Sequence, residues 1–181
     1  VWIIVAVVVA LILVYVIGTY NSLVGLRNKV EDGWAQIDVQ LKRRADLIPN
    51  LVETVKGYAK HEEETLTAVI EARNKAVSAG GVNEKIDAEN QLTGALNKLF
   101  ALTEAYPELK ANTNFMSLQN DLKDTEDKIS MARQFYNDSV LTYNNKVESV
   151  PSNIVANIAG FKKGEFFQIA ESEKEAPKVK F

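Results

Sequence analysis

The feature that most constrains this chain is an uninterrupted apolar run at its amino-terminal end. Residues 1–20 hold 18 apolar side chains, with Gly18 and Thr19 as the exceptions, and the first charged residue is Arg27. Twenty helical residues measure about 30 Å at about 1.5 Å each, which matches the hydrocarbon core of a bilayer. A helix also satisfies every backbone hydrogen-bonding group without water. Residues 1–20 are therefore predicted to form one transmembrane helix.

Aromatic residues at both ends of this run are predicted to anchor it at the two membrane interfaces: Trp2, Tyr15 and Tyr20. The alternative is a cleaved signal peptide, whose apolar core is usually about 7–15 residues long and precedes a small-residue cleavage site. This run is longer and is followed by Gly-Thr-Tyr-Asn, which favours the membrane helix. Because Arg27 and Lys29 follow the run, the positive-inside rule favours the cytoplasmic side for the bulk of the chain.

The polar remainder of the chain repeats apolar residues at alternating spacings of three and four, as amphipathic helices do. Helices are predicted over residues 21–79, 83–106 and 114–149, the first of them continuing the membrane helix. A short helix follows, with Ser152 as its expected cap. In the first predicted helix, the residues at these spacings form one line along the helix, which we call its seam. They are Leu23, Leu26, Val30, Trp34, Ile37, Leu41, Arg44, Ile48, Leu51, Val55 and Tyr58.

The predicted fold is therefore all-α: an N-terminal transmembrane helix that continues into a long antiparallel up-and-down helical bundle. Its expected parts are the membrane helix at 1–20, the bundle at 21–150, and a short helix with an aromatic and charged tail at 151–181. One point stays open, because the break at Pro107 either reverses the chain or only bends it. A full reversal would place the carboxy-terminal segment far from the membrane, and a bend would place it near the membrane.

Composition excludes several classes of protein. The chain has no Cys, which removes disulfide frameworks, thiol nucleophiles and Cys-ligated metals. A net charge of −3 leaves no basic footprint for nucleic acid, so none is expected as a partner.

Several short motifs, spread over the whole chain, resemble the LemA family of bacterial membrane proteins. They are residues 34–44 (WAQIDVQLKRR), 46–59 (DLIPNLVETVKGYA), 106–112 (YPELKAN), 151–153 (PSN) and 177–181 (PKVKF). Gly33 departs from the pattern, since the resemblance leads us to expect Ala there. The resemblance implies a single amino-terminal membrane helix, a long helical bundle and no established biochemical activity.

No catalytic, cofactor-binding or metal-binding constellation is recognised in the sequence. His61 precedes three glutamates, but a helical zinc motif needs a second His four residues later, where this chain has Thr65. Paired carboxylates such as Asp124 and Asp127 are typical of a solvated helix face. The sequence therefore predicts no enzyme, no cofactor and no metal site.

The most informative polar residue is Arg44, because it occupies a seam position where Leu would be expected. We expect Arg43 or Arg44 to pair with Glu126 of the third helix and to set the register of the bundle. An Arg that extends to solvent is the equal alternative. Pro49 should kink the first helix, and Asp46 is placed to cap the amides that Pro49 frees.

The tail combines aromatic and basic residues. Phe161, Phe166 and Phe167 stand among lysines, which suits a membrane surface or the groove of a neighbouring subunit, and a cap over the end of the bundle is an equal alternative. The sequence as a whole predicts a membrane-anchored helical scaffold that self-associates, with membrane lipid and other membrane proteins as further partners. The second hypothesis is a ligand-sensing, receptor-like bundle.

Overall fold

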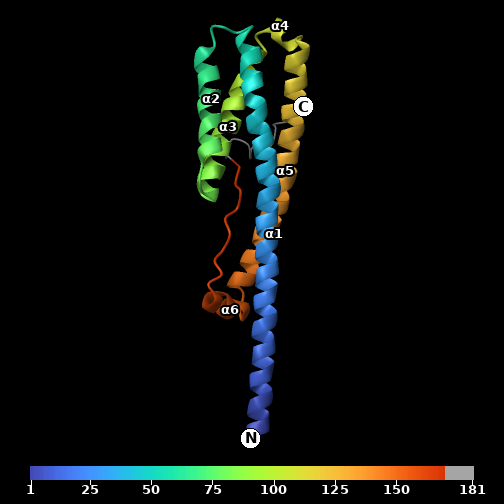
Figure 1. The fold of residues 1–181 in the computed structure, drawn as a ribbon, viewed down its shortest axis with the longest axis vertical. Helices are drawn as coiled ribbons and strands as arrows, with labels where there is room; N and C mark the ends of the chain where they lie inside the picture. The colour runs from blue at the N-terminus through green and yellow to red at the C-terminus, as the bar shows by residue number, and fades with distance from the viewer. Residues whose placement is uncertain (170–181) are drawn as a thin grey trace, which may run out of the picture. The chain divides into compact units, whose positions relative to one another are not determined.

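The computed structural model describes residues 1–169. This part of the chain contains six helices and no strand, so the prediction of an all-α fold is confirmed (Figure 1). The helices are α1 (Trp2–Lys56), α2 (Glu63–Ser78), α3 (Val82–Thr103), α4 (Pro107–Lys110), α5 (Thr113–Glu148) and α6 (Ser152–Ala159).

The chain divides into two compact units, which are described separately. Unit 1 comprises Val1–Ile37 and Ala132–Phe166, and unit 2 comprises Asp38–Met131 and the segment that begins at Phe167. Both α1 and α5 contribute residues to each unit.

Unit 1 begins with the apolar run, whose side chains from Val1 to Ile17 are all exposed. By length and composition, α1 is able to cross a membrane. Beyond the run, α1 packs against the end of α5 and against α6. The core of this unit consists of Leu23, Tyr143, Val147, Val155, Ala156 and Phe161, with Val24, Leu26 and Val30 at its edge.

Gly33 explains how closely α1 and α5 approach each other in unit 1. A Cβ atom at this position would lie 3.1 Å from Tyr136 Cα and 3.3 Å from Phe135 Cδ1, so no side chain fits without a shift. Next to it, the rings of Trp34 and Tyr136 are 5.5 Å apart. The departure from the family pattern at Gly33 is therefore a point of tight helix packing.

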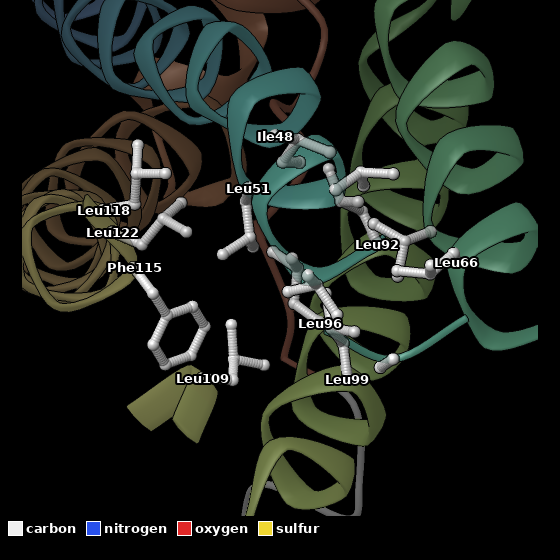
Figure 2. Packing of buried hydrophobic residues seen from close by; sticks show 14 of the residues in the cluster. Ile48, Leu51, Leu66, Leu92, Leu96, Leu99, Leu109, Phe115, Leu118 and Leu122 are labelled. Atoms are coloured by element: carbon white, nitrogen blue, oxygen red, sulfur yellow. The ribbon is translucent and has the colours of Figure 1, made fainter. Parts of the chain in front are cut away.

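Unit 2 is a bundle of the second part of α1, α2, α3 and the first part of α5, with α4 in the connection between α3 and α5. Figure 2 shows leucines from these elements meeting around Leu51 and Phe115. The buried core of the unit comprises Ile48, Leu51, Val52, Val55, Ala59, Leu66, Val69, Ala76, Ala88, Leu92, Leu96, Leu99, Leu109, Phe115, Leu118 and Leu122. Ile48, Leu51 and Val55 belong to the predicted seam of the first helix, and their burial is that expected for an amphipathic helix.

The expectation of one helix over residues 21–79 is wrong. α1 ends at Lys56, and a turn over residues 57–62 leads into α2. The amides of Tyr58 and Ala59 both donate to the carbonyl of Val55, which closes α1. Glu63 and Glu64 then form an acidic first turn, which favours a helix start. Gly57 and this acidic turn were the available sequence signals.

The break at Pro107 reverses the chain within unit 2. Asn114 Nδ2 lies 3.2 Å from Thr54 Oγ1, and Arg43 Nη1 lies 3.3 Å from Asp124 Oδ2. Residue numbers therefore increase along α5 in the direction in which they decrease along α1. The side chain of Asn112 caps α5 by accepting from the amide of Phe115 at 3.0 Å. The two helices are therefore antiparallel, as an up-and-down bundle requires.

Two local expectations need correction. Asp46 is exposed and forms no side-chain hydrogen bond among residues 1–169, so the predicted cap is not present there. Ser152 does not cap α6, because its hydroxyl lies 2.7 Å from the carbonyl of Lys146 and 2.8 Å from that of Ser149, where it donates back to the end of α5. The α-helix runs on through Pro49, and a kink at that residue stays a prediction.

Candidate functional site

The centre of unit 2 is a buried arginine that joins three helices. Arg44 of α1 is 1% exposed. Its Nη2 lies 2.6 Å from Glu89 Oε2 on α3, and its Nη1 lies 2.6 Å from Glu126 Oε1 on α5. A planar guanidinium suits this task because it presents several donors in a fixed geometry. We call Arg44, Glu89, Glu126, Thr93 and Lys85 the ionic centre.

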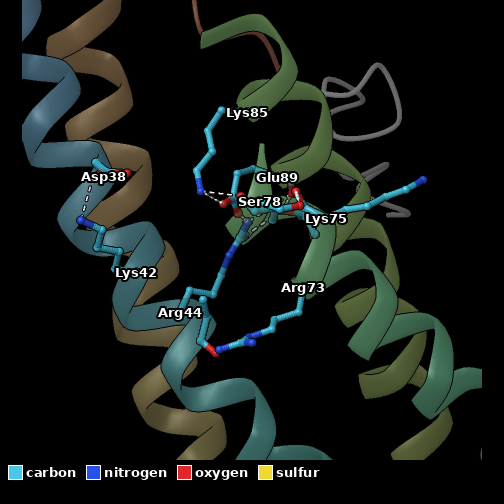
Figure 3. A network of polar contacts seen from close by, with 11 residues as sticks. Asp38, Lys42, Arg44, Arg73, Lys75, Ser78, Lys85 and Glu89 are labelled. Carbon is cyan, nitrogen blue, oxygen red and sulfur yellow. Dashed lines mark hydrogen bonds and ion pairs between the residues drawn. The ribbon is translucent and has the colours of Figure 1, made fainter. Parts of the chain in front are cut away.

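The rest of the ionic centre surrounds the same guanidinium, and Figure 3 shows Arg44 and Lys85 converging on Glu89. Arg44 Nη1 also donates to Thr93 Oγ1 at 2.9 Å, and Nη2 donates to the carbonyl of Glu89 at 3.2 Å. Lys85 Nζ lies 3.3 Å from Glu89 Oε1. Two cations thus face two carboxylates, which is the pairing that burial of charge requires.

The pKa of Arg44 follows from this arrangement. Burial alone would lower the pKa of the guanidinium, but the carboxylates of Glu126 and Glu89 outweigh it and raise the pKa above its ordinary value. Arg44 is therefore a permanent positive charge inside the bundle, and each carboxylate that it contacts is held in place by that charge.

The expected partner of Arg44 is present, whereas its role in setting register stays a prediction. Arg43 instead lies at the surface, with Nη1 3.3 Å from Asp124 Oδ2, and Lys128 approaches the same carboxylate oxygen at 3.0 Å. The hydrogen bond from Lys128, together with the charges of Lys128 and Arg43, lowers the pKa of Asp124.

Glu89 is the residue that sequence reasoning missed. Ile86, Leu92, Leu96 and Leu99 are all buried on the same face of α3, and Glu89 stands among them at three-residue spacing. A carboxylate at a seam position of α3 was thus the counterpart of an arginine at a seam position of α1. The signal was present, but no carboxylate of the helix predicted at 83–106 was singled out.

A groove of about 510 Å³ adjoins the ionic centre between α3 and α5. It shares Thr93 and Glu126 with the centre. Within residues 1–169, four of its polar side chains make no hydrogen bond or ion pair: Asn97, Gln119, Asn120 and Lys123. The apolar part of the lining is Leu96, Phe100 and Leu122. A volume of this size and a mixed lining are typical of small-molecule sites.

The predicted membrane-interface residues lie in unit 1, and the predicted tail residues are divided between the two units. In unit 1, the aromatic residues Trp2, Tyr15 and Tyr20 are exposed, and the ring of Phe161 packs edge-on against Tyr20 at 5.6 Å. Phe161 is buried and Phe166 is exposed in the same unit, whereas Phe167 is buried in unit 2. The tail beyond residue 169 lies outside the described residues.

An extended segment of unit 1, residues 161–166, is held along α5 by hydrogen bonds to its backbone. Tyr143 Oη donates to the carbonyl of Lys162 at 2.7 Å, and Tyr136 Oη donates to the carbonyl of Glu165 at 2.6 Å. Burial raises the pKa of both tyrosines, so both hydroxyls keep the proton that they donate. Asn144 and Gly164 form two hydrogen bonds. Asn144 Nδ2 donates to the carbonyl of Gly164 at 3.1 Å, and the backbone amide of Gly164 donates to Asn144 Oδ1 at 2.8 Å.

Replacing Asn144 should release this segment locally. In Asn144→Ala, the amide and carbonyl of Gly164 lose their partner, at a cost of about 1–3 kcal/mol. Hydrogen exchange at the Gly164 amide should therefore become faster, and helix content should stay the same. Asn145→Ala, which changes the exposed neighbour, is the matched control. Equal exchange rates in the two variants would contradict the assignment.

Metal-ligating side chains do not gather in the described part of the chain. Among residues 1–169, no group of three or more His, Asp or Glu residues is placed to hold a metal ion, and His61 is exposed.

Comparison with known proteins identifies the family. Residues 33–181 match the LemA family. Magnetosome protein MamQ 2 of Paramagnetospirillum magneticum is 27% identical over 82% of this chain and 64% of its own length. Magnetosome protein MamQ of Magnetospirillum gryphiswaldense is 25% identical with the same coverage. Protein LemA of Metamycoplasma hominis is 27% identical over 87% of this chain and 73% of its own length.

The chain thus spans slightly less than two thirds of the length of the magnetosome proteins that it matches. The family match, by contrast, extends over more than four fifths of the chain and includes Arg44, Glu89 and Glu126. The chain belongs to the LemA family.

Proposed function

We propose that this protein is a membrane-anchored helical scaffold of the bacterial envelope, which self-associates and works by binding, without a catalytic step. The observation that carries the proposal is the continuity of α1. One helix contains the apolar run, contributes Leu23 to the core of unit 1, and contributes Ile48 and Leu51 to the core of unit 2. An anchor and a bundle that share a helix keep the bundle at the membrane surface, where a scaffold acts.

The relatives fit a membrane-associated helical protein and leave the partner open. Two of them are named magnetosome proteins, and they extend beyond the length of this chain. We propose lipid, further copies of this chain and other membrane proteins as partners. No nucleic acid is expected, given the net charge of −3.

Self-association is tested by the mass of the full-length protein in a membrane mimic. Multi-angle light scattering of the solubilised full-length protein at micromolar concentration should give the mass of an oligomer. A strict monomer that purifies without any other protein would contradict the scaffold proposal.

Sidedness is tested with a single cysteine, because the chain contains none. We propose that the bundle lies on the cytoplasmic side of the inner membrane, on the basis of Arg27 and Lys29. A cysteine placed at the exposed Gly80 should then react with an impermeant maleimide only after the membrane is opened. Labelling of intact cells at the same rate would place the bundle outside.

The alternative function is a ligand-sensing bundle, and the groove between α3 and α5 favours it. Four polar side chains without partners among residues 1–169 line that groove, beside a centre that ties α1 to α3 and α5. A metabolite that binds there should raise the unfolding temperature of the protein. Asn120→Ala should abolish that increase, and an increase that persists in Asn120→Ala would place the ligand elsewhere.

A further inference from the structure

The short helix α6 carries apolar side chains on two opposite faces. Its inner face is buried in unit 1 through Val155 and Ala156. On the other face, Ile154 and Ile158 are spaced four residues apart and are 57% and 83% exposed, and Val150, which precedes the helix, is 80% exposed. Residues at this spacing lie on one side of a helix. No residue of the described chain covers this side, which we call the outer stripe.

The position of α6 in unit 1 suggests what covers the outer stripe. Val155 and Ala156 pack in one cluster with Leu23, which is only three residues beyond the end of the apolar run. Phe161, which follows α6 directly, packs on Tyr20, the last residue of the run. Figure 1 shows α6 beside α1, with its axis running across the direction of α1 and not along it. With residues 1–20 as the membrane span, a helix with this direction at this level lies along the membrane surface.

The charges around α6 fit an anionic lipid surface. Residues 20–30 and 146–163 together contain five basic residues and one acidic residue, and the next charged residues further along the chain, Glu31, Asp32 and Glu165, are acidic. The basic residues are Arg27, Lys29, Lys146, Lys162 and Lys163. The acidic residue, Glu148, forms an ion pair with Lys163. The Arg27 guanidinium carbon lies 4.9 Å from the centre of the Phe161 ring, at the same end of unit 1.

We propose that α6 is an interfacial membrane-docking helix, whose outer stripe enters the boundary between headgroups and acyl chains while the surrounding basic residues bind anionic headgroups. An amphipathic helix with basic flanks is the usual element for this contact. The proposal rests on the proposed membrane anchor, since it takes residues 1–20 as the span.

The test measures depth at single sites in the full-length protein, reconstituted in vesicles that contain anionic phosphatidylglycerol. Spin labels are attached at Ile158→Cys on the outer stripe, at Asn145→Cys on an exposed position of α5, and at Leu11→Cys within the apolar run. The ratio of collisions with oxygen to collisions with a water-soluble nickel chelate rises with depth in the bilayer. We expect a high ratio at 11, an intermediate ratio at 158 and a low ratio at 145.

The outcomes separate this proposal from the membrane anchor. A high ratio at 11 with equal low ratios at 158 and 145 overturns the docking of α6 and leaves the anchor in place. A low ratio at 11 overturns the anchor, and the docking proposal with it. A label at 158 that is shielded from both reagents indicates contact with protein, such as a second copy of this chain, and also overturns the proposal.

A second pair of variants measures the contribution of the outer stripe. With the label at 158, Ile154→Ser should lower the ratio of docked to undocked α6 by roughly tenfold, because one large apolar side chain no longer enters the lipid. Leu141→Ser removes an exposed apolar side chain from α5 of the same unit and is the matched control. Equal effects of the two substitutions would overturn the proposal.

Discussion

Unit 2 should unfold far more easily in the variant Arg44→Met than in variants substituted at a neighbouring surface position. Its free energy of unfolding should fall by about 3–5 kcal/mol. The reason is that the buried carboxylate of Glu89 remains after its partner Arg44 is removed. Glu89 has a side chain that is 2% exposed, and without Arg44 its one remaining ion-pair partner within residues 1–169 is Lys85. Hydrogen exchange of unit 2 peptides, combined with denaturant unfolding followed by circular dichroism, measures the loss.

Arg43→Met is the matched control, because it removes the adjacent arginine from a solvated pair. The side chains of Arg43 and Asp124 are 42% and 52% exposed, so the loss should stay within about 1 kcal/mol. The double variant Arg44→Met with Glu89→Met removes the two most buried charges but leaves Lys85 without its carboxylate partner, so it should recover only part of the stability. Should Arg44→Met prove no worse than Arg43→Met, the ionic centre would not stabilise the bundle.

The second large effect is expected at the junction of α4 and α5. Phe115→Ala should lower the free energy of unfolding of unit 2 by about 3–5 kcal/mol, through lost apolar burial and the cavity that remains. Phe115 is 1% exposed, and Figure 2 shows its ring beside Leu109. Thermal unfolding monitored by circular dichroism measures the effect.

Met116→Ala is the control for this substitution, since it lies one residue further along α5 and is 47% exposed. Its cost should stay within about 0.5 kcal/mol. If both variants unfold alike, Phe115 is not part of the core that joins α4 to α5.

Much of the fold was predictable, because helix periodicity is a local property of a sequence. Leu41, Ile48 and Leu51 are spaced for one face of α1, and all three are buried. The turn at 57–62 was not recognised, because the periodic spacing of α1 extends to Tyr58, which lies inside the turn. A periodic residue in a turn looks the same in the sequence as a periodic residue in a helix.

The candidate site was predictable only in part. Arg44 stood out because a charge at a seam position must find a partner, and Glu126 was named for that reason. Glu89 was not named, although it lies 2.6 Å from the same guanidinium. Many carboxylates along the chain carry the same charge, and only the packing of α3 against α1 selects one of them.

The sequence by itself determined that the chain is helical, that its first twenty residues suit a membrane, and that it resembles the LemA family. Periodicity, apolar length and local motifs need no knowledge of distant contacts. The tertiary structure alone decided that the chain reverses near Pro107, that Glu89 joins Arg44, and that α6 packs beside Leu23 with its outer stripe exposed. Each of these depends on contacts between residues far apart in the chain, whose closeness is set by how the helices pack together.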